Sequence, residues 1–242
     1  MYSFAMQPLD GAYQRVNRAS EHLEDLKERI IIICQRKKNI IFPQVQPDFS
    51  GLLKIRKDGK PIIGATIGNT EFTEHIISIL VGEVIYNMRA ALDYLVYELA
   101  CFDSKQLVDG TQFPIEDCVK NFDKRIGSLD DRRKGVFLRG ISDKHVKAIK
   151  HLQPCDGCLW IKVLREISNP DKHRKLTIIN SPVSFRWSAH IAELPSIQQS
   201  MHMYNGMSVQ VVFDNSLPVI ETLEQLHSEI TNVLDLFKPE FK

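Results

Sequence analysis

The sequence lacks the features that mark several large classes of proteins. Its longest unbroken apolar stretch, Ile30–Cys34, is far shorter than the ~20 residues that a membrane-spanning helix needs. No basic region followed by an apolar stretch stands at the N-terminus, so we expect no secretion signal. The five cysteines show no regular spacing, which favours reduced thiols. We therefore expect a cytoplasmic protein without membrane contact.

Motifs for cofactors and metals are also scarce. The chain has no glycine-rich phosphate loop, no G-x-S-x-G and no H-E-x-x-H. Cys155 and Cys158 have the two-residue gap of a zinc or redox pair, but no second pair stands at a suitable distance. We interpret this pair as chance spacing in a loop, and we expect neither a cofactor nor a bound metal.

The chain as a whole has no large excess of positive or negative charge, but individual segments do. The formal net charge is +1, so total charge indicates no class of partner. Residues 120–151 nevertheless carry ten Lys and Arg against four Asp, whereas 71–118 carry nine acids against two bases. Either these segments face each other or water, or the basic one forms a strip for RNA or another polyanion. We prefer the first interpretation, because no aromatic residues alternate with the bases as in a base-stacking platform.

Hydrophobic residues make up 43% of the chain, and their spacing predicts a mainly helical fold. Apolar residues recur at steps of three and four in three long segments, which predicts helices at 9–36, at roughly 72–101 and from 216–218 to 237. We expect shorter helices at 143–151, capped by Ser142, and at 158–168, with two more near 118–126 and 130–136.

The apolar period changes to two in other segments. Strands at 52–57 and 61–67 flank Asp58-Gly59, a favoured hairpin turn, and further strands are expected after residue 175. The predicted fold class is α+β, mainly α: a helical bundle with long N-terminal, central and C-terminal helices, a β-hairpin and a small antiparallel sheet. We expect a single domain over 1–242, with the hairpin inserted at 50–68 and the C-terminal strands and helix at 175–238.

Two edges of the central helix carry polar residues. At 100° per residue, Arg89 and Asp93 lie one turn apart on one edge of the apolar face, and Asn87 lies on the other edge. Arg89 and Asp93 could form an ordinary surface ion pair, worth ~0.3–0.5 kcal/mol. They could also be half of a polar cluster that another segment completes. The spacing leaves both alternatives open.

The stretch "ISNPDKHRKL", residues 167–176, is the natural candidate for that other segment. Pro170 disfavours helical geometry at Asn169, so we expect the preceding helix to end there and Pro170-Asp171 to form a turn. This segment is either a structural helix-to-strand corner or a site in which His173 carries a proton. In the second case Arg89, together with Lys172 and Arg174, would hold an anion.

Four pieces in order resemble a family of bacterial proteins whose activity is not established. The pieces are "LVGEVIYNMRAALDYLVYEL", "TQFPIED", "LRGIS" with "AIKHLQP", and "LWIKVLREISNPDKHRKL". The resemblance covers about residues 10–180 and implies that the N-x-R-x-A-L-D helix meets the N-x-D-K-H-R corner. The matching residues are Asn87, Arg89, Leu92, Asp93, Phe113, Pro114, Gln153, Pro154, Asn169, Asp171, Lys172, His173 and Arg174.

More distantly, the chain resembles the HEPN superfamily of helical-bundle ribonucleases and nucleotide-binding proteins. Asn169 and His173 match the N-x-x-x-H half of its motif, whereas Tyr94 stands where a His would follow Arg89. The resemblance implies metal-independent RNA cleavage of a defence or toxin type, with His173 as general acid or base and Arg89 neutralising the phosphate.

Two functions follow as expectations. The first is an RNA-binding or RNA-cleaving protein with His173, Arg89 and Asp93 as catalytic residues. Its ligand-binding residues would be Asn87, Asn169, Asp171, Lys172 and Arg174. The alternative is a non-catalytic binding or scaffold module in which the Arg/Asp/His cluster is structural. The apolar faces of the long helices at 9–36 and 217–237 also predict a homodimer.

Overall fold

The computed structural model describes residues 7–41, 53–55, 61–66, 75–172, 183–187, 206–209, 213 and 217–241, with side chains at 7–32, 76–168, 213 and 217–241. The chain forms two compact units. The first comprises residues 1–26, 78–177 and 220–242, and the second comprises 27–77 and 178–219. The expected single domain over 1–242 stays a prediction.

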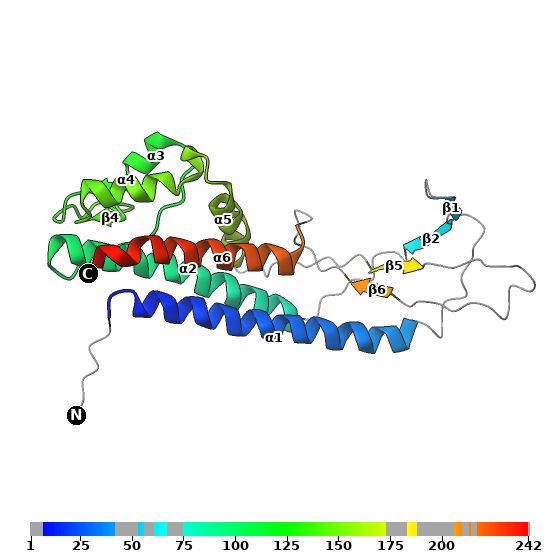
Figure 1. Ribbon diagram of the computed structural model, residues 1–242. Helices are drawn as coiled ribbons and strands as arrows, with labels where there is room; N and C mark the ends of the chain where they lie inside the picture. The colour runs from blue at the N-terminus through cyan, green and yellow to red at the C-terminus, as the bar shows by residue number, and fades with distance from the viewer. Residues whose placement is uncertain are drawn as a thin grey trace, which may run out of the picture. The chain divides into compact units, whose positions relative to one another are not determined.

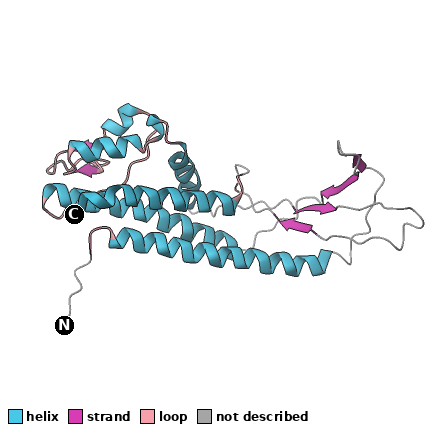
Figure 2. Ribbon diagram, viewed as in Figure 1, coloured by secondary structure: helices cyan, strands magenta, loops and turns pink. Residues whose placement is uncertain are grey.

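Three long helices dominate the structure, as the apolar periodicity predicts (Figures 1 and 2). They are α1 (Asp10–Ile41), α2 (His75–Ser104) and α6 (Val219–Phe237). Within the first unit, polar contacts join α1 to both of the others. The Tyr13 hydroxyl donates to Asp235 Oδ1 over 2.6 Å, and Arg15 Nη1 donates to Asn87 Oδ1 over 3.2 Å. The predicted long N-terminal, central and C-terminal helices are therefore confirmed.

The core of the first unit centres on α2. A helix that is apolar on most sides has to be covered on most sides, and α2 fits this rule. Its side chains that are no more than 1% exposed are Ile77, Val81, Val84, Ile85, Met88, Ala91, Leu92, Leu95, Val96, Leu99 and Ala100. Burying such residues removes apolar surface from water, which contributes about 25 cal/mol per Å² to folding.

A smaller group of elements follows α2. It consists of α3 (Val119–Asp123), β3 (Ile126–Gly127), β4 (Leu138–Arg139), α4 (Asp143–His151), the 3-10 turn η1 (Pro154–Asp156) and α5 (Leu159–Lys172). The helices expected near 118–126 and at 143–151 are present, but the helix expected near 130–136 is not, so that prediction is wrong. Asp131 forms a local turn instead, because its Oδ1 accepts the backbone N–H of Arg133 over 3.1 Å.

The small sheet in this group is parallel. Ile126 pairs with Leu138, and Gly127 pairs with Arg139. Parallel neighbours need a connection that crosses back, and the segment between the two strands provides it. The sequence predicted antiparallel pairing alone, and this ladder corrects that expectation, because strands of two residues leave no readable alternation in a sequence.

Helix α5 does not end at Asn169. Its backbone continues through Pro170 to Lys172, so the predicted helix stop and the predicted turn at Pro170-Asp171 are wrong. Proline removes one N–H and crowds the carbonyl four residues earlier, here that of Glu166. Only Asp171 and Lys172 follow Pro170 in the helix, so the missing hydrogen bond to the Glu166 carbonyl affects its last turn alone.

The described strands of the second unit form one sheet. They are β1 (Leu53–Ile55), β2 (Pro61–Thr66), β5 (Val183–Trp187) and β6 (Gly206–Val209), in the order β1-β2-β5-β6 with antiparallel neighbours. The strand expected at 176–179 lies outside the described residues. None of the described helices is both long enough and apolar enough to cross a membrane.

A pair of leucines on α6 tests the assignment of the core. Leu234 is fully buried, whereas Leu236 is 64% exposed. We expect Leu234→Ala to lower the free energy of unfolding by about 2–5 kcal/mol, because it removes buried methyl groups and leaves a cavity. Leu236→Ala is the matched control and should change it by less than about 0.5 kcal/mol. Urea unfolding measures both, and equal losses would contradict the placement of α6.

Candidate functional site

Arg89 and Asp93 on α2 hold the backbone of a distant residue, Phe113. The Arg89 guanidinium donates through Nη2 to the Phe113 carbonyl oxygen, and the Phe113 N–H donates to Asp93 Oδ1 over 2.8 Å. Arg89 Nη2 also lies 3.6 Å from Asp93 Oδ1. The three residues form what we call the Phe113 clamp, in which one ion pair satisfies both backbone polar groups of a single residue.

Two members of the Phe113 clamp are buried, and the third, Asp93, is half-buried. The Phe113 side chain is fully covered, and only 9% of Arg89 is exposed. Loss of water around the guanidinium lowers the pKa of Arg89, and the nearby Asp93 carboxylate raises it. Because an arginine side chain is not deprotonated in proteins, the clamp contains a buried cation that depends on its acceptors.

The segment that follows Phe113 is held by side chains from other elements. Gln153, which is fully buried, accepts the N–H of Glu116 over 3.0 Å and donates to the Ile149 carbonyl over 3.1 Å. Arg165 on α5 contacts Asp117 at 2.7 Å. The segment "TQFPIED" is therefore held in part by side chains of α2, the α4–η1 connection and α5.

The structure distributes the predicted site residues among different places. Arg89 and Asp93 meet each other, as the spacing allowed. Asn87 lies at the contact of α2 with α1, where it also donates to the Glu83 carbonyl over 2.8 Å. It is therefore not part of the clamp.

The remaining predicted residues belong to the end of α5 and beyond. The backbones of Asn169, Asp171 and Lys172 form the last turn of that helix, but their side chains lie outside the described residues. His173 and Arg174 lie outside the description entirely. The predicted meeting of His173 with Arg89 stays a prediction.

Two nitrogen atoms of Arg89 lack a hydrogen-bond acceptor among the described residues. Nε and Nη1 are both buried, and neither has a partner there. A buried donor without a partner costs about 1–3 kcal/mol. The clamp thus uses part of the guanidinium and leaves two of its nitrogens without an acceptor among the described residues.

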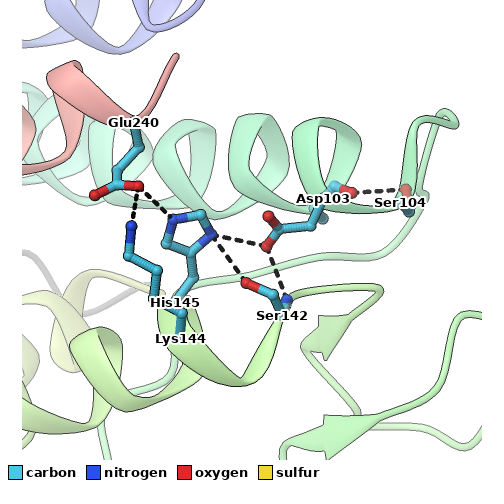
Figure 3. Close-up of polar contacts among 7 residues, drawn as sticks. Asp103, Ser104, Ser142, Lys144, His145 and Glu240 are labelled. Carbon is cyan, nitrogen blue, oxygen red and sulfur yellow. Dashed lines mark hydrogen bonds and ion pairs between the residues drawn. The ribbon is translucent and has the colours of Figure 1, made fainter. Parts of the chain in front are cut away.

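A second polar cluster surrounds His145 on α4 (Figure 3). Its Nδ1 lies 2.8 Å from Asp103 Oδ2 on α2, and its Nε2 lies 3.4 Å from Glu240 Oε2. Glu240 belongs to η2 (Lys238–Phe241) at the end of the chain and also pairs with Lys144. An imidazole with one proton can donate to one carboxylate only, whereas the doubly protonated ring can donate to both.

The first turn of α4 is fixed through the same cluster. Ser142 is the N-cap residue of this helix, as expected, but its hydroxyl makes no capping hydrogen bond. The hydroxyl lies 3.3 Å from His145 Nδ1, and the Ser142 N–H donates to Asp103 Oδ2 over 2.8 Å. Burial raises the pKa of Asp103, but hydrogen bonds from Ser142 and His145 outweigh burial and hold that pKa below its ordinary value.

Sequence reasoning did not predict the His145 cluster. One signal was present, because His145 shares the inward face of α4 with Val146 and Ile149. A histidine in that position needs polar partners from elsewhere in the fold. Nothing in the chain indicates that these partners come from residues 103 and 240.

Cys155 and Cys158 lie on either side of Gly157, at the end of the 3-10 turn η1 and before α5. Cys155 and Cys158 are free thiols, and burial raises the pKa of both. A raised pKa reduces the share of the reactive thiolate. Across the part of the chain with described side chains, no group of three His, Cys, Asp or Glu residues could hold a metal ion.

Comparison with protein-family models, with curated proteins and with solved structures finds no match for this chain. The two resemblances drawn from the sequence therefore stay predictions.

Removal of the Arg89 side chain from the Phe113 clamp should lower the stability of the protein. We expect Arg89→Ala to lower the free energy of unfolding by about 3 kcal/mol, because the Phe113 carbonyl and the Asp93 carboxylate both lose a buried partner. The matched control is Arg18→Ala, which breaks an exposed pair with Glu21 and should cost less than about 1 kcal/mol. Denaturant unfolding separates the two, and a loss at Arg89 no greater than at Arg18 would refute a structural role.

The His145 cluster predicts a defined pH dependence. The folded pKa of Asp103 lies below the ordinary value of 3.8, so its charge stabilises the fold above that pH, and this stability is lost as the pH falls through the folded pKa. Asp103→Asn should therefore destabilise the protein near pH 7. The difference from the wild type should shrink below about pH 4.

Urea unfolding at stepped pH values measures that convergence. Asp130→Asn, at an exposed position, is the control, and its difference in stability from the wild type should not depend on pH in this way. If the Asp103→Asn difference is the same near pH 3 as near pH 7, the carboxylate does not act as described.

Proposed function

We propose that this protein is a non-catalytic binding module in which Arg89 and Asp93 serve the fold. The observation that carries the proposal is the Phe113 clamp, in which the cation and the carboxylate hold one backbone residue from both sides. A catalytic arginine must approach a phosphate, whereas this guanidinium is buried and already donates to a carbonyl group. A cytoplasmic location and a homodimer belong to the same proposal.

A second candidate function is RNA cleavage of the HEPN type. The observation that favours it is the pair of buried Arg89 nitrogens without a described partner, since a phosphate oxygen is an acceptor that fits them. In that function His173 would transfer the proton, Asp93 would orient Arg89, and the ligand-binding group would be Asn87, Asn169, Asp171, Lys172 and Arg174. The two candidate functions differ in the role of Arg89. In the non-catalytic module, which we call the scaffold proposal, Arg89 only stabilises the fold, whereas in the ribonuclease it also binds phosphate.

An RNA-cleavage assay separates the two functions. We expect the wild-type protein to leave a fluorescent single-stranded RNA intact in the presence of EDTA. His173→Ala should be equally inactive. Arg89→Lys keeps the charge but loses the planar fork, so it should lower the melting temperature without changing any activity.

Two outcomes would overturn the scaffold proposal. One is cleavage by the wild type that His173→Ala abolishes. The other is cleavage that Arg89→Lys abolishes while its folded fraction at the assay temperature stays unchanged. Either outcome would establish the second candidate function instead.

A further inference from the structure

The segment from α3 to α4 carries more positive charge than its own contacts neutralise. Four of its ten cations form ion pairs. Arg125 lies 2.7 Å from Glu116, Arg133 lies 2.6 Å from Asp131, and Lys150 lies 3.7 Å from Asp123. The fourth, Lys144, pairs with Glu240. Carboxylates of this chain neutralise the charge of these four cations.

Five other cations of this segment are exposed and have no ion-pair partner among the described residues. They form what we call the basic face, which consists of Lys120, Lys124, Arg132, Lys134 and Lys147. Only Asp130 and Asp143 are exposed acids without an ion pair in the same stretch, so five cations against two acids leave a local charge of +3. The structure thus identifies which cations of this segment are exposed and not neutralised by a nearby carboxylate.

Helical geometry directs three of the lysines outward. Lys120 and Lys124 each stand two residues from Phe122, the fully buried residue of α3, and therefore lie on the opposite side of the helix, one turn apart. On α4 the inward face is formed by His145 and its neighbours, and Lys147 lies about 160° around the helix from its centre.

Contacts between α3, the following loop and α4 keep the elements that carry these cations close to one another. Lys150 on α4 pairs with Asp123 on α3 and lies 5.9 Å from the centre of the Phe122 ring. Arg125, directly after Lys124, donates to the Gly135 carbonyl over 3.2 Å, which ties the loop with Arg132 and Lys134 to the end of α3. Figure 1 shows α3 and α4 as neighbouring green helices.

We propose that the basic face binds the phosphate backbone of a nucleic acid duplex, an inference that rests on the proposed binding function. Four of the five side chains are lysines, which are depleted in protein–protein interfaces, whereas interfaces with nucleic acids are strongly positive. Phe122 of α3 is buried, and Phe137 of the loop is half-buried with the Arg125 guanidinium 4.9 Å from the centre of its ring. Without an exposed ring to stack on bases, recognition is through phosphates.

The test uses full-length protein and three fluorescent probes of equal length: an RNA duplex, a DNA duplex and poly-glutamate. The triple variant Lys120→Glu, Lys124→Glu and Lys147→Glu is compared with a control triple, Arg18→Glu, Lys105→Glu and Lys162→Glu, which changes three exposed cations elsewhere. Both triples change the net charge equally, so a difference between them reports the position of the charge. Arg132 and Lys134 stay unchanged because they flank the turn that Arg133 and Asp131 form.

We expect the wild type to bind a duplex, with RNA and DNA affinities showing which sugar is preferred. The basic-face triple should bind at least tenfold more weakly, and its dependence of log Kd on log salt should be shallower by about 3. The control triple should stay within about threefold of the wild type. Melting temperatures of all three proteins check that they are folded.

Three outcomes would overturn the inference: no duplex binding by the wild type, equal losses in both triples, or binding of poly-glutamate as tight as that of a duplex. None of these three outcomes tests the proposed non-catalytic function, which only RNA cleavage by the wild type would overturn. Conversely, RNA cleavage that the wild type performs and the basic-face triple does not would overturn the non-catalytic function but support the basic face as a binding surface. The two failures are therefore distinguishable.

Discussion

The arrangement of the first unit depends on one buried ion pair that holds one backbone residue. Arg89 and Asp93 bind the carbonyl and the N–H of Phe113. The chain leaves α2 at Ser104 and reaches α3 only after this segment, so the clamp fixes the start of the connection to the elements from α3 to α5. A buried ion pair adds little net stability on its own, but losing one partner leaves the other without a counter-charge, which is strongly destabilising.

Local patterns predicted the helices and part of this interaction. Apolar periodicity gave α1, α2 and α6, and the helical wheel placed Arg89 and Asp93 on one edge. The partner could not be read from the sequence, because it is a backbone group, and every residue has one. The polar stretch at 167–176 is more conspicuous in the sequence, but there too a local rule is insufficient, because α5 continues through Pro170.

The pairing of charged residues was also not predictable from the sequence. Counting identified an excess of cations between α3 and α4, but only tertiary contacts show which of them are neutralised. Lys144 pairs with Glu240 and Lys150 with Asp123, partners that are 96 and 27 residues away. His145 likewise obtains its carboxylates from α2 and from the end of the chain. Polar pairing across a fold has no periodicity, so a single sequence does not reveal it.

Amide hydrogen exchange at Phe113 tests the central interaction most directly. In the wild-type protein the Phe113 N–H should exchange as slowly as core amides of α2, because it donates to a carboxylate beside a buried cation. In Asp93→Ala the same amide should exchange at least ~100-fold faster, while amides in the middle of α6 change far less. A Phe113 amide that exchanges in the wild type as fast as those in exposed turns would contradict the clamp.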